Sequence, residues 1–356
     1  MRGPVVPFFI SHRGCPHQCV FCDQVTISGE DGAFPSRDDI LGKIAAWRDS
    51  AGGRPVEAAF FGGTFTSLPL PVQERLLAPL QPLIATGEVT SIRVSTRPDA
   101  IDPAIVRFLK SMGVATVELG VQSMDDDVLQ RAGRGHTAAD VEVASSLLRE
   151  AGMVLGMQLM PGLPGDTPER SVGSLKRVLA LQPDFIRIYP TIVIAGTQLE
   201  ELYRQGAYAP LSLKEAVIRC KIMLHLALKA RVPVIRMGLQ PTDELNAAGA
   251  VVAGPYHPAF RQLVAGELFY DLSLRLLDGL PADSHVILYS APGRIADVTG
   301  HRRSNLSRLF TTCGVKIEAV KGRPDIAPSG LIVAAGEFVR RGDIIADLDY
   351  TGGTSS

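Results

Sequence analysis

Short apolar runs alternate with amphipathic helical segments through the first two hundred residues of the chain. The runs are rich in β-branched and aromatic residues, which is typical of strands that a parallel sheet buries on both faces. Several helical segments between them begin at Asp, Thr or Pro and end near Gly, as capped helices do. The six strand candidates are Val5–Ser11, Val56–Gly62, Ser91–Thr96, Thr116–Ser123, Val154–Met160 and Phe185–Thr191.

Six such β-α units in series predict an α/β fold with a parallel sheet, specifically a partial (β/α)6 TIM-like barrel. Beyond the sixth run the rhythm changes. Two long helices are expected at 212–232 and 261–279, and a new alternation of strands and helices follows them. We therefore predict a barrel over residues 1–208, a helical extension over 209–280 that completes or covers it, and a small C-terminal α+β domain over 281–356.

Polar and glycine-rich stretches gather where the predicted strands end. In chain order they read CPHQCVFC, GGTFTS, STRPD, ELGVQS, MQLMPGLPG and YPT. Sites in parallel α/β folds form at the carboxyl ends of the strands. Six separate pieces of the chain are therefore expected to converge on one mouth.

Composition and charge narrow the class of protein. With 46% hydrophobic and 21% charged residues the chain should bury a sizeable core, and no apolar run approaches the roughly 18 residues of a membrane span. The first residues lack a signal-peptide pattern, so the sequence predicts a cytoplasmic protein with no membrane partner. A net charge of −1 gives no overall signature of nucleic-acid binding.

Three of the five cysteines lie within eight residues, in the order Cys15-x3-Cys19-x2-Cys22. In a reducing compartment such a group indicates a metal or catalysis rather than disulfides. A structural zinc site uses four ligands, usually as two pairs, and a thioredoxin-type motif leaves Cys15 unexplained. Three thiolates on the loop after the first strand suit a cubane iron–sulfur cluster with one iron open to a substrate or cofactor.

This spacing, directly after the first strand of a βα barrel, resembles the radical S-adenosylmethionine (SAM) superfamily. The resemblance implies that Cys15, Cys19 and Cys22 hold a 4Fe-4S cluster whose fourth iron chelates the methionine part of SAM. It also implies cleavage of SAM to a 5′-deoxyadenosyl radical that abstracts hydrogen from a substrate, with an external flavodoxin- or ferredoxin-type electron donor. A barrel suits this chemistry because it shields a reactive radical from water.

Motifs over 56–208 resemble the radical domain of the Elongator catalytic subunit. The resemblance implies that the backbone of the GGT motif receives the methionine ammonium group, and that polar side chains at the later strand ends contact the ribose or methionine. For Ser95 and Gln122, a hydrogen-bonded polar group in the core remains an alternative. Arg134 is expected at the methionine carboxylate, and the alternative is a solvated surface charge. The residues expected at the cofactor are Phe21, Gly62, Gly63, Thr64, Ser95, Gln122 and Arg134.

The chain departs from the Elongator subunit in three places. Its first two cysteines are closer together, and Gln158 stands where the subunit has a His at the end of the fifth strand. Only about 75 residues follow Leu280, too few for the acetyltransferase domain of the subunit. The activity of the whole subunit is therefore not expected to carry over unaltered.

Candidates for substrate contact lie on three parts of the chain. Gln158 ends the fifth strand, and Tyr256 and His257 lie between prolines on an expected loop, where a packed turn is an equal alternative. Arg302 and Arg303 belong to the stretch 291–323, which carries seven Lys or Arg against two acidic residues. A basic face of this kind is compatible with RNA binding, although an ordinary solvated surface is commoner.

Three functions remain open from the sequence. The first is radical SAM chemistry on an RNA base, by resemblance to the Elongator subunit. The second is the same chemistry on a small molecule or a protein side chain. The third is an iron–sulfur binding or electron-transfer module without catalysis.

Overall fold

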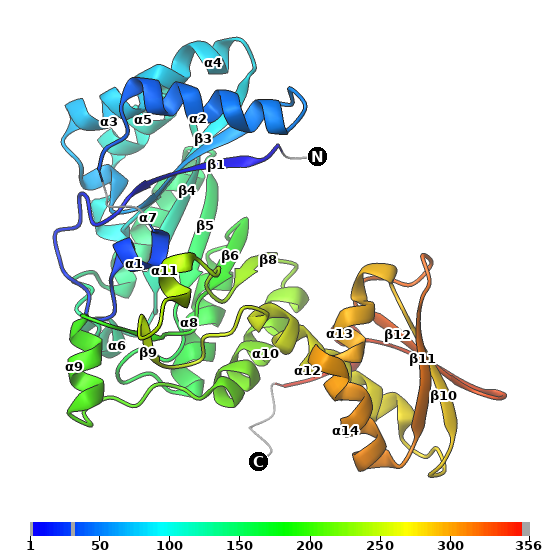
Figure 1. Ribbon diagram of the computed structural model, residues 1–356. Helices are drawn as coiled ribbons and strands as arrows, with labels where there is room; N and C mark the ends of the chain where they lie inside the picture. Colours follow the sequence, from blue (N-terminus) through cyan, green and yellow to red (C-terminus); the bar gives the residue numbers. More distant parts are fainter. Residues whose placement is uncertain (1–2, 30–32, 351–356) are drawn as a thin grey trace. The chain divides into compact units, whose positions relative to one another are not determined.

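The computed structural model describes residues 3–29 and 33–350 of the chain (Figure 1). Contacts divide the chain into two compact units. The domain boundaries expected from the sequence, after residues 208 and 280, stay a prediction. The first unit consists of Met1–Leu211, Val232–Ile235 and Leu239–Tyr256, and the second of Ser212–Arg231, Arg236–Gly238 and His257–Ser356.

The first unit is built on a curled parallel sheet (Figure 1), which confirms the predicted α/β fold with a partial TIM-like barrel. Strands β1 to β6 pair in chain order, each parallel to the next. A seventh strand, β8, follows β6 at the edge and is not among the six predicted strands. The strands are β1 Val5–Ile10, β2 Val56–Gly62, β3 Val89–Thr96, β4 Val114–Gln122, β5 Val154–Leu159, β6 Phe185–Ile188 and β8 Val234–Met237.

Helices connect successive strands, and their starts follow from capping residues. Ser36 and Thr137 each accept from a backbone N–H one turn later, while Asp39 and Asp140 reach back to complete capping boxes. A small antiparallel pair joins β7, Val193–Ile194, to β9, Val251–Ala253. The helices of this unit are α1 Gln24–Ser28, α2 Arg37–Ser50, α3 Leu70–Leu77, α4 Gln81–Ala85, α5 Pro103–Ser111, α6 Asp126–Arg131, α7 Ala138–Glu150, α8 Pro168–Ala180, α9 Gln198–Arg204 and α11 Asp243–Asn246.

The two faces of the sheet differ in chemistry. The outer face, toward the helices, carries fully buried apolar side chains such as Phe60, Val94 and Leu119. Removing each from water contributes about 1.5–3 kcal/mol. The inner face carries charged side chains, including Arg93 and Glu118, which are also buried. These side chains are buried on both faces, as the apolar runs predict, although the inner face also carries charge.

The second unit combines two long helices with a four-stranded sheet in the order β11-β10-β12-β13. β10 is parallel to β11 and antiparallel to β12. None of the helices within the described ranges is long and apolar enough to cross a membrane. The elements are α10 Leu213–Lys229, α12 Phe260–Leu277, β10 His285–Ser290, α13 Ile295–Thr299, α14 Ser304–Cys313, β11 Lys316–Gly322, β12 Gly330–Ala335, β13 Phe338–Asp343 and α15 Ile344–Asp347.

Candidate metal and cofactor site

The loop after β1 carries the three clustered cysteines. It leaves the strand through a turn in which the Arg13 N–H donates to the Ile10 carbonyl at 3.0 Å. The Cys19 side chain is buried, and those of Cys15 and Cys22 are half-buried. All three thiols therefore lie at the carboxyl edge of the sheet, where the fold places functional groups.

The GGT motif at the end of β2 holds the start of this loop. Gly63 N–H donates to the Ile10 carbonyl at 3.2 Å, and Thr64 N–H donates to the Arg13 carbonyl at 2.8 Å. The Thr64 hydroxyl lies 3.3 Å from the Cys15 sulfur. A Cβ atom on Gly63 would overlap the Arg13 carbonyl oxygen, so only glycine allows this approach.

We expect Gly63→Ala to reduce iron loading of the reconstituted protein by about 10- to 100-fold, because the added methyl group pushes the cysteine loop off β2. Iron per chain after anaerobic reconstitution measures this. Gly173→Ala on α8 is the matched control, since a Cβ there meets no atom within 4 Å. Equal iron loading in the two variants would show that the close approach at Gly63 is not needed.

The GRGHT segment, Gly133–Thr137, follows α6 and packs against the other end of the cysteine loop. Val20 N–H donates to the Ala132 carbonyl at 3.1 Å. Arg134 is buried, with Nη1 donating to the Cys19 sulfur at 3.3 Å and Nη2 donating to the Gly120 carbonyl at 2.6 Å. A side chain at Gly135 would overlap the His17 ring. Arg134 is therefore not a solvated surface charge.

The electrostatics of the loop reflect its burial. Burial, together with the neighbouring Cys19 and Cys15, raises the pKa of the Cys22 thiol to about 12, and Arg134 opposes the rise. Burial, together with Arg134 and Arg97, lowers the pKa of His136 to about 3, so this imidazole is neutral at physiological pH. His136 Nε2 lies 3.2 Å from the Val121 carbonyl oxygen. This residue was not selected from the sequence, because no motif singles it out.

The donor set fits an iron–sulfur cluster. Such clusters are held by thiolates and tuned by hydrogen bonds to their sulfur atoms, and here a buried guanidinium donates to one of three thiols on one loop. Within residues 3–29 and 33–350, no three His, Cys, Asp or Glu side chains stand together as a ready-made metal site. Metal binding commonly completes the arrangement of its own ligands.

Phe21 belongs to the cysteine loop, between Cys19 and Cys22. It is 8% exposed and packs in an apolar cluster that includes Cys19, Val128, Leu163 and Tyr208. The structure thus anchors the loop through this ring. The expected contact of Phe21 with adenine stays a prediction.

The structure brings Gln122 and Gln158 together at the ends of β4 and β5. Gln158 Nε2 donates to Gln122 Oε1 at 3.1 Å. Gln122 has a left-handed backbone with φ of 66°, at an irregularity in the pairing of β4 with β5. A non-glycine residue in this conformation is strained, and such strain is often found at functional sites. Ser95 is half-buried on β3, in register with Glu118.

A buried ion-pair network crosses the inner face, and the sequence analysis missed it. Arg93 donates to Glu118 at 2.6 Å and to Glu57 at 2.8 Å. Arg187 donates to Glu118 at 3.0 Å, and a second pair of their atoms lies 2.8 Å apart. The available signal was one charged residue inside each of four otherwise apolar runs.

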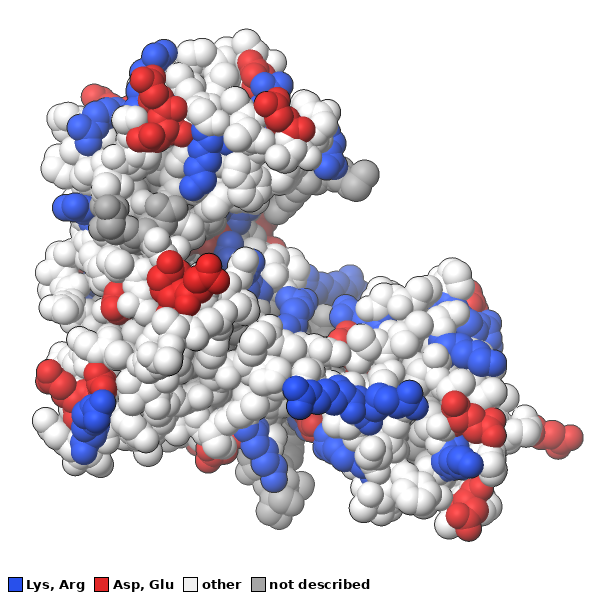
Figure 2. Space-filling view, in the orientation of Figure 1, with Lys and Arg blue, Asp and Glu red and all other residues white. Residues whose placement is uncertain are grey.

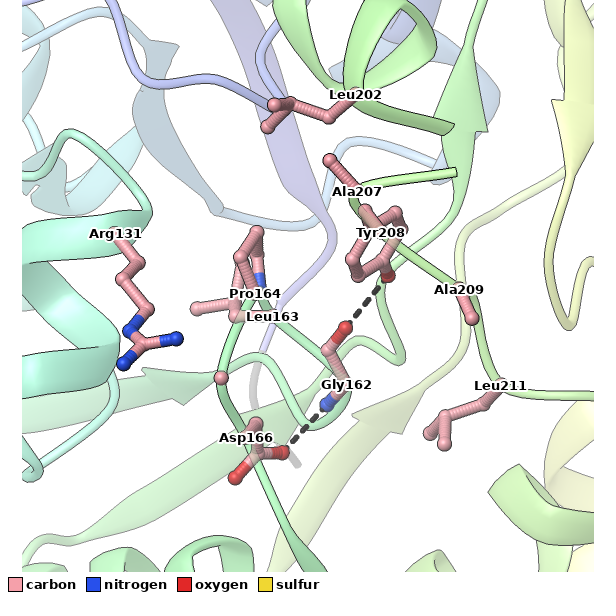
Figure 3. A pocket seen from close by; sticks show the side chains of 11 residues that line it. Arg131, Gly162, Leu163, Pro164, Asp166, Leu202, Ala207, Tyr208, Ala209 and Leu211 are labelled. Carbon is pink, nitrogen blue, oxygen red and sulfur yellow. Dashed lines mark hydrogen bonds between the residues drawn. The ribbon is translucent and has the colours of Figure 1, made fainter. Parts of the chain in front are cut away.

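A pocket of about 390 Å³ lies at the loop after β5 (Figure 3). Gly162 N–H donates to Asp166 at 2.7 Å, and the Tyr208 hydroxyl donates to the Gly162 carbonyl at 2.6 Å. These bonds fix the backbone of Met160–Thr167, which reads MPGLPGDT. The pocket is lined by that stretch, by Arg131 and by residues of 202–211, and the three cysteines are not among its lining residues.

The remaining candidates for substrate contact separate into two groups. Tyr256, in the first unit, bonds Asn246 through its hydroxyl at 2.9 Å. His257, in the second unit, stacks edge-on against His301, with ring centroids 5.1 Å apart. Arg302 and Arg303 beside it are exposed. Over the face in Figure 2, Lys and Arg are interspersed with Asp and Glu, as the near-zero net charge leads one to expect.

Two family profiles match the chain. The profile of the Radical SAM superfamily matches residues 9–177. The profile of the Radical SAM C-terminal domain matches residues 183–269. Together they match well over half of the chain.

Curated relatives point to the Elongator branch. The chain is 28% identical to a tRNA uridine(34) acetyltransferase of Dehalococcoides mccartyi over 55% of this chain and 50% of the relative. It is 31% identical to Elongator complex protein 3 of Saccharomyces cerevisiae over 46% of this chain and 33% of the relative. The chain thus spans half or less of these relatives' length.

Among solved structures, archaeal Elp3 of Methanocaldococcus infernus, lacking residues 1–46, covers 97% of this chain and 76% of its own, with a TM-score of 0.57 and 19% identity. At that identity the likeness supports the fold alone. The two family profiles and the curated relatives carry the assignment further. The chain belongs to the radical SAM superfamily, with Elongator-type relatives, and is a radical SAM enzyme.

Proposed function

We propose that Cys15, Cys19 and Cys22 bind a 4Fe-4S cluster that holds SAM, and that the enzyme abstracts hydrogen from an RNA base. The observation that carries this is the loop of three thiols, held by GGT at one end and by the GRGHT segment at the other. When bound, the cluster supplies the electron that cleaves SAM to methionine and a 5′-deoxyadenosyl radical. We further propose a cytoplasmic enzyme served by a flavodoxin- or ferredoxin-type donor.

The residues of the chain would bind and orient the cofactor. The N–H groups of Gly63 and Thr64 donate to the Ile10 and Arg13 carbonyls and fix the motif. The ammonium group, itself a donor, would bind backbone carbonyl oxygens. Arg134 stabilises negative charge on the Cys19 sulfur. Its pairing with the methionine carboxylate, and contacts of Ser95 and Gln122 with the ribose or methionine, remain part of the proposal.

The choice of an RNA base rests on the relatives. Two of them are named for tRNA uridine(34) acetylation and for the Elongator complex. Because this chain spans half or less of their length, the activity of the whole relatives is not assumed for it.

The test is anaerobic reconstitution and reduction of the protein with SAM, followed by measurement of 5′-deoxyadenosine. Absence of 5′-deoxyadenosine would refute the radical chemistry and leave an electron-transfer module. Two samples from cells grown in deuterated medium, tRNA and a small-metabolite extract, are then supplied separately to the reduced protein with SAM. Deuterium in 5′-deoxyadenosine from the tRNA sample alone supports an RNA base. Deuterium from the metabolite sample alone replaces the RNA proposal with a small-molecule substrate.

A further inference from the structure

The inner face of the sheet contains a tyrosine to which no role has been assigned. Tyr189 directly follows β6, and its N–H donates at 2.9 Å to the carbonyl of Leu159, the last residue of β5. Its side chain is half-buried. Arg187, two residues earlier on the same face, donates from Nη1 to the Tyr189 hydroxyl at 3.1 Å. The phenol oxygen is therefore an acceptor in that bond, and its own proton is directed elsewhere.

Arg187 is held in place by the buried ion-pair network. Two contacts to Glu118, at 2.8 and 3.0 Å, fix the guanidinium fork. Its guanidinium carbon also lies over the Phe61 ring, 5.6 Å from the ring centroid. Glu118 is in turn fixed by Arg93, which also pairs with Glu57. The Tyr189 hydroxyl is thus oriented by a chain of contacts that spans four strands.

The network is electrically balanced. It contains two Arg and two Glu, and the side chains of all four are at most 16% exposed. No guanidinium in it is left over to neutralise an anion. Bringing an anionic group against this network would require removing that charge from water without a matching cation among its four members, which is costly. A neutral polar group does not carry this cost of burying an unpaired charge. The neutral side chain of Gln158 already lies next to the network, in register with Arg187.

We propose that Tyr189 is a substrate-binding residue, which donates a hydrogen bond to an uncharged carbonyl or ring-nitrogen acceptor, and that this face selects neutral over anionic groups. The proposal rests on the proposed function, because it takes the inner face as the place where the substrate enters. Within the structure the alternative is a purely structural tyrosine that does no more than accept from Arg187.

The experiment measures binding to the reconstituted enzyme with SAM, left unreduced so that no turnover occurs. The probes are uridine, a neutral ring with carbonyl acceptors, and orotidine, the same nucleoside with a carboxylate on the ring. We expect saturable binding of uridine and at least about tenfold weaker binding of orotidine. Tyr189→Phe should weaken uridine binding about 3- to 10-fold, as loss of one hydrogen bond does.

Tyr203→Phe on α9 is the matched control, because Tyr203 is exposed at 38% and outside the inner face. Unchanged uridine affinity in Tyr189→Phe, equal affinity for orotidine, or no saturable uridine binding would each overturn the proposal. Thermal unfolding monitored by circular dichroism verifies that both variants fold. The proposed function fails on a different readout, the absence of 5′-deoxyadenosine after reduction, so the two failures are distinguishable.

Discussion

Cys19→Ala is expected to lose the broad visible absorbance of an iron–sulfur cluster and more than about 100-fold of SAM cleavage, beyond the range seen when only an orienting residue is removed. Cys19 is the most buried of the three thiols and the one whose sulfur accepts from Arg134. The loop carries three cysteines, so it has no fourth thiol to replace Cys19. Iron content, the absorption spectrum and 5′-deoxyadenosine formation after anaerobic reconstitution measure the loss.

Cys313→Ala is the control for this variant. Cys313 ends α14 in the second unit and is half-buried, so its replacement tests for a general effect of losing a thiol. The control should keep full iron and full cleavage. If Cys19→Ala did the same, the assignment of the loop as the cluster ligand set would be wrong.

The second large effect is on stability. Glu118→Ala should lower the free energy of unfolding of the first unit by ~3–5 kcal/mol. The substitution removes the carboxylate that pairs with both Arg93 and Arg187, while the two guanidinium groups stay buried. Arg93 retains Glu57, but among the residues that the structure describes Arg187 retains only the neutral Tyr189 as a side-chain hydrogen-bond partner. Urea unfolding followed by fluorescence measures the change, since the single tryptophan, Trp47, lies on α2.

Glu142→Ala is the matched comparison. Glu142 also pairs with an arginine, Arg177, at 2.7 Å, but both side chains are 48% exposed. Exposed pairs of this kind contribute about 0–1 kcal/mol. Similar losses in Glu118→Ala and Glu142→Ala would mean that the inner-face network is not desolvated in solution.

The sequence allowed prediction of everything that local periodicity encodes. The six parallel strands follow from short apolar runs, and the thiol loop follows from the spacing of Cys15, Cys19 and Cys22. Helix starts at Ser36 and Thr137 follow from capping chemistry over four residues. Each of these signals is contained within a few neighbouring residues, so tertiary structure has little influence on it.

Features that depend on distant partners could not be predicted. The surroundings of Arg134 depend on Cys19 and Gly120, and the charge on Arg93 is tolerated inside the barrel only because Glu57 and Glu118 flank it. The contact of Gln158 with Gln122 depends on the register of β4 with β5. Strand β8 is short and joins the sheet at an edge, where pairing with β6 outweighs a weak local pattern.

The attachment of the cysteine loop to later parts of the chain has a consequence for biosynthesis. Val20, in the loop, bonds Ala132 and also accepts from the Leu199 N–H at 2.7 Å. At ~5–20 residues per second, Leu199 is translated roughly 10–35 s after Val20. During that interval the nascent thiols lack their final supports. If the loop holds the proposed cluster, delivery of iron and sulfide belongs after translation has passed Leu199.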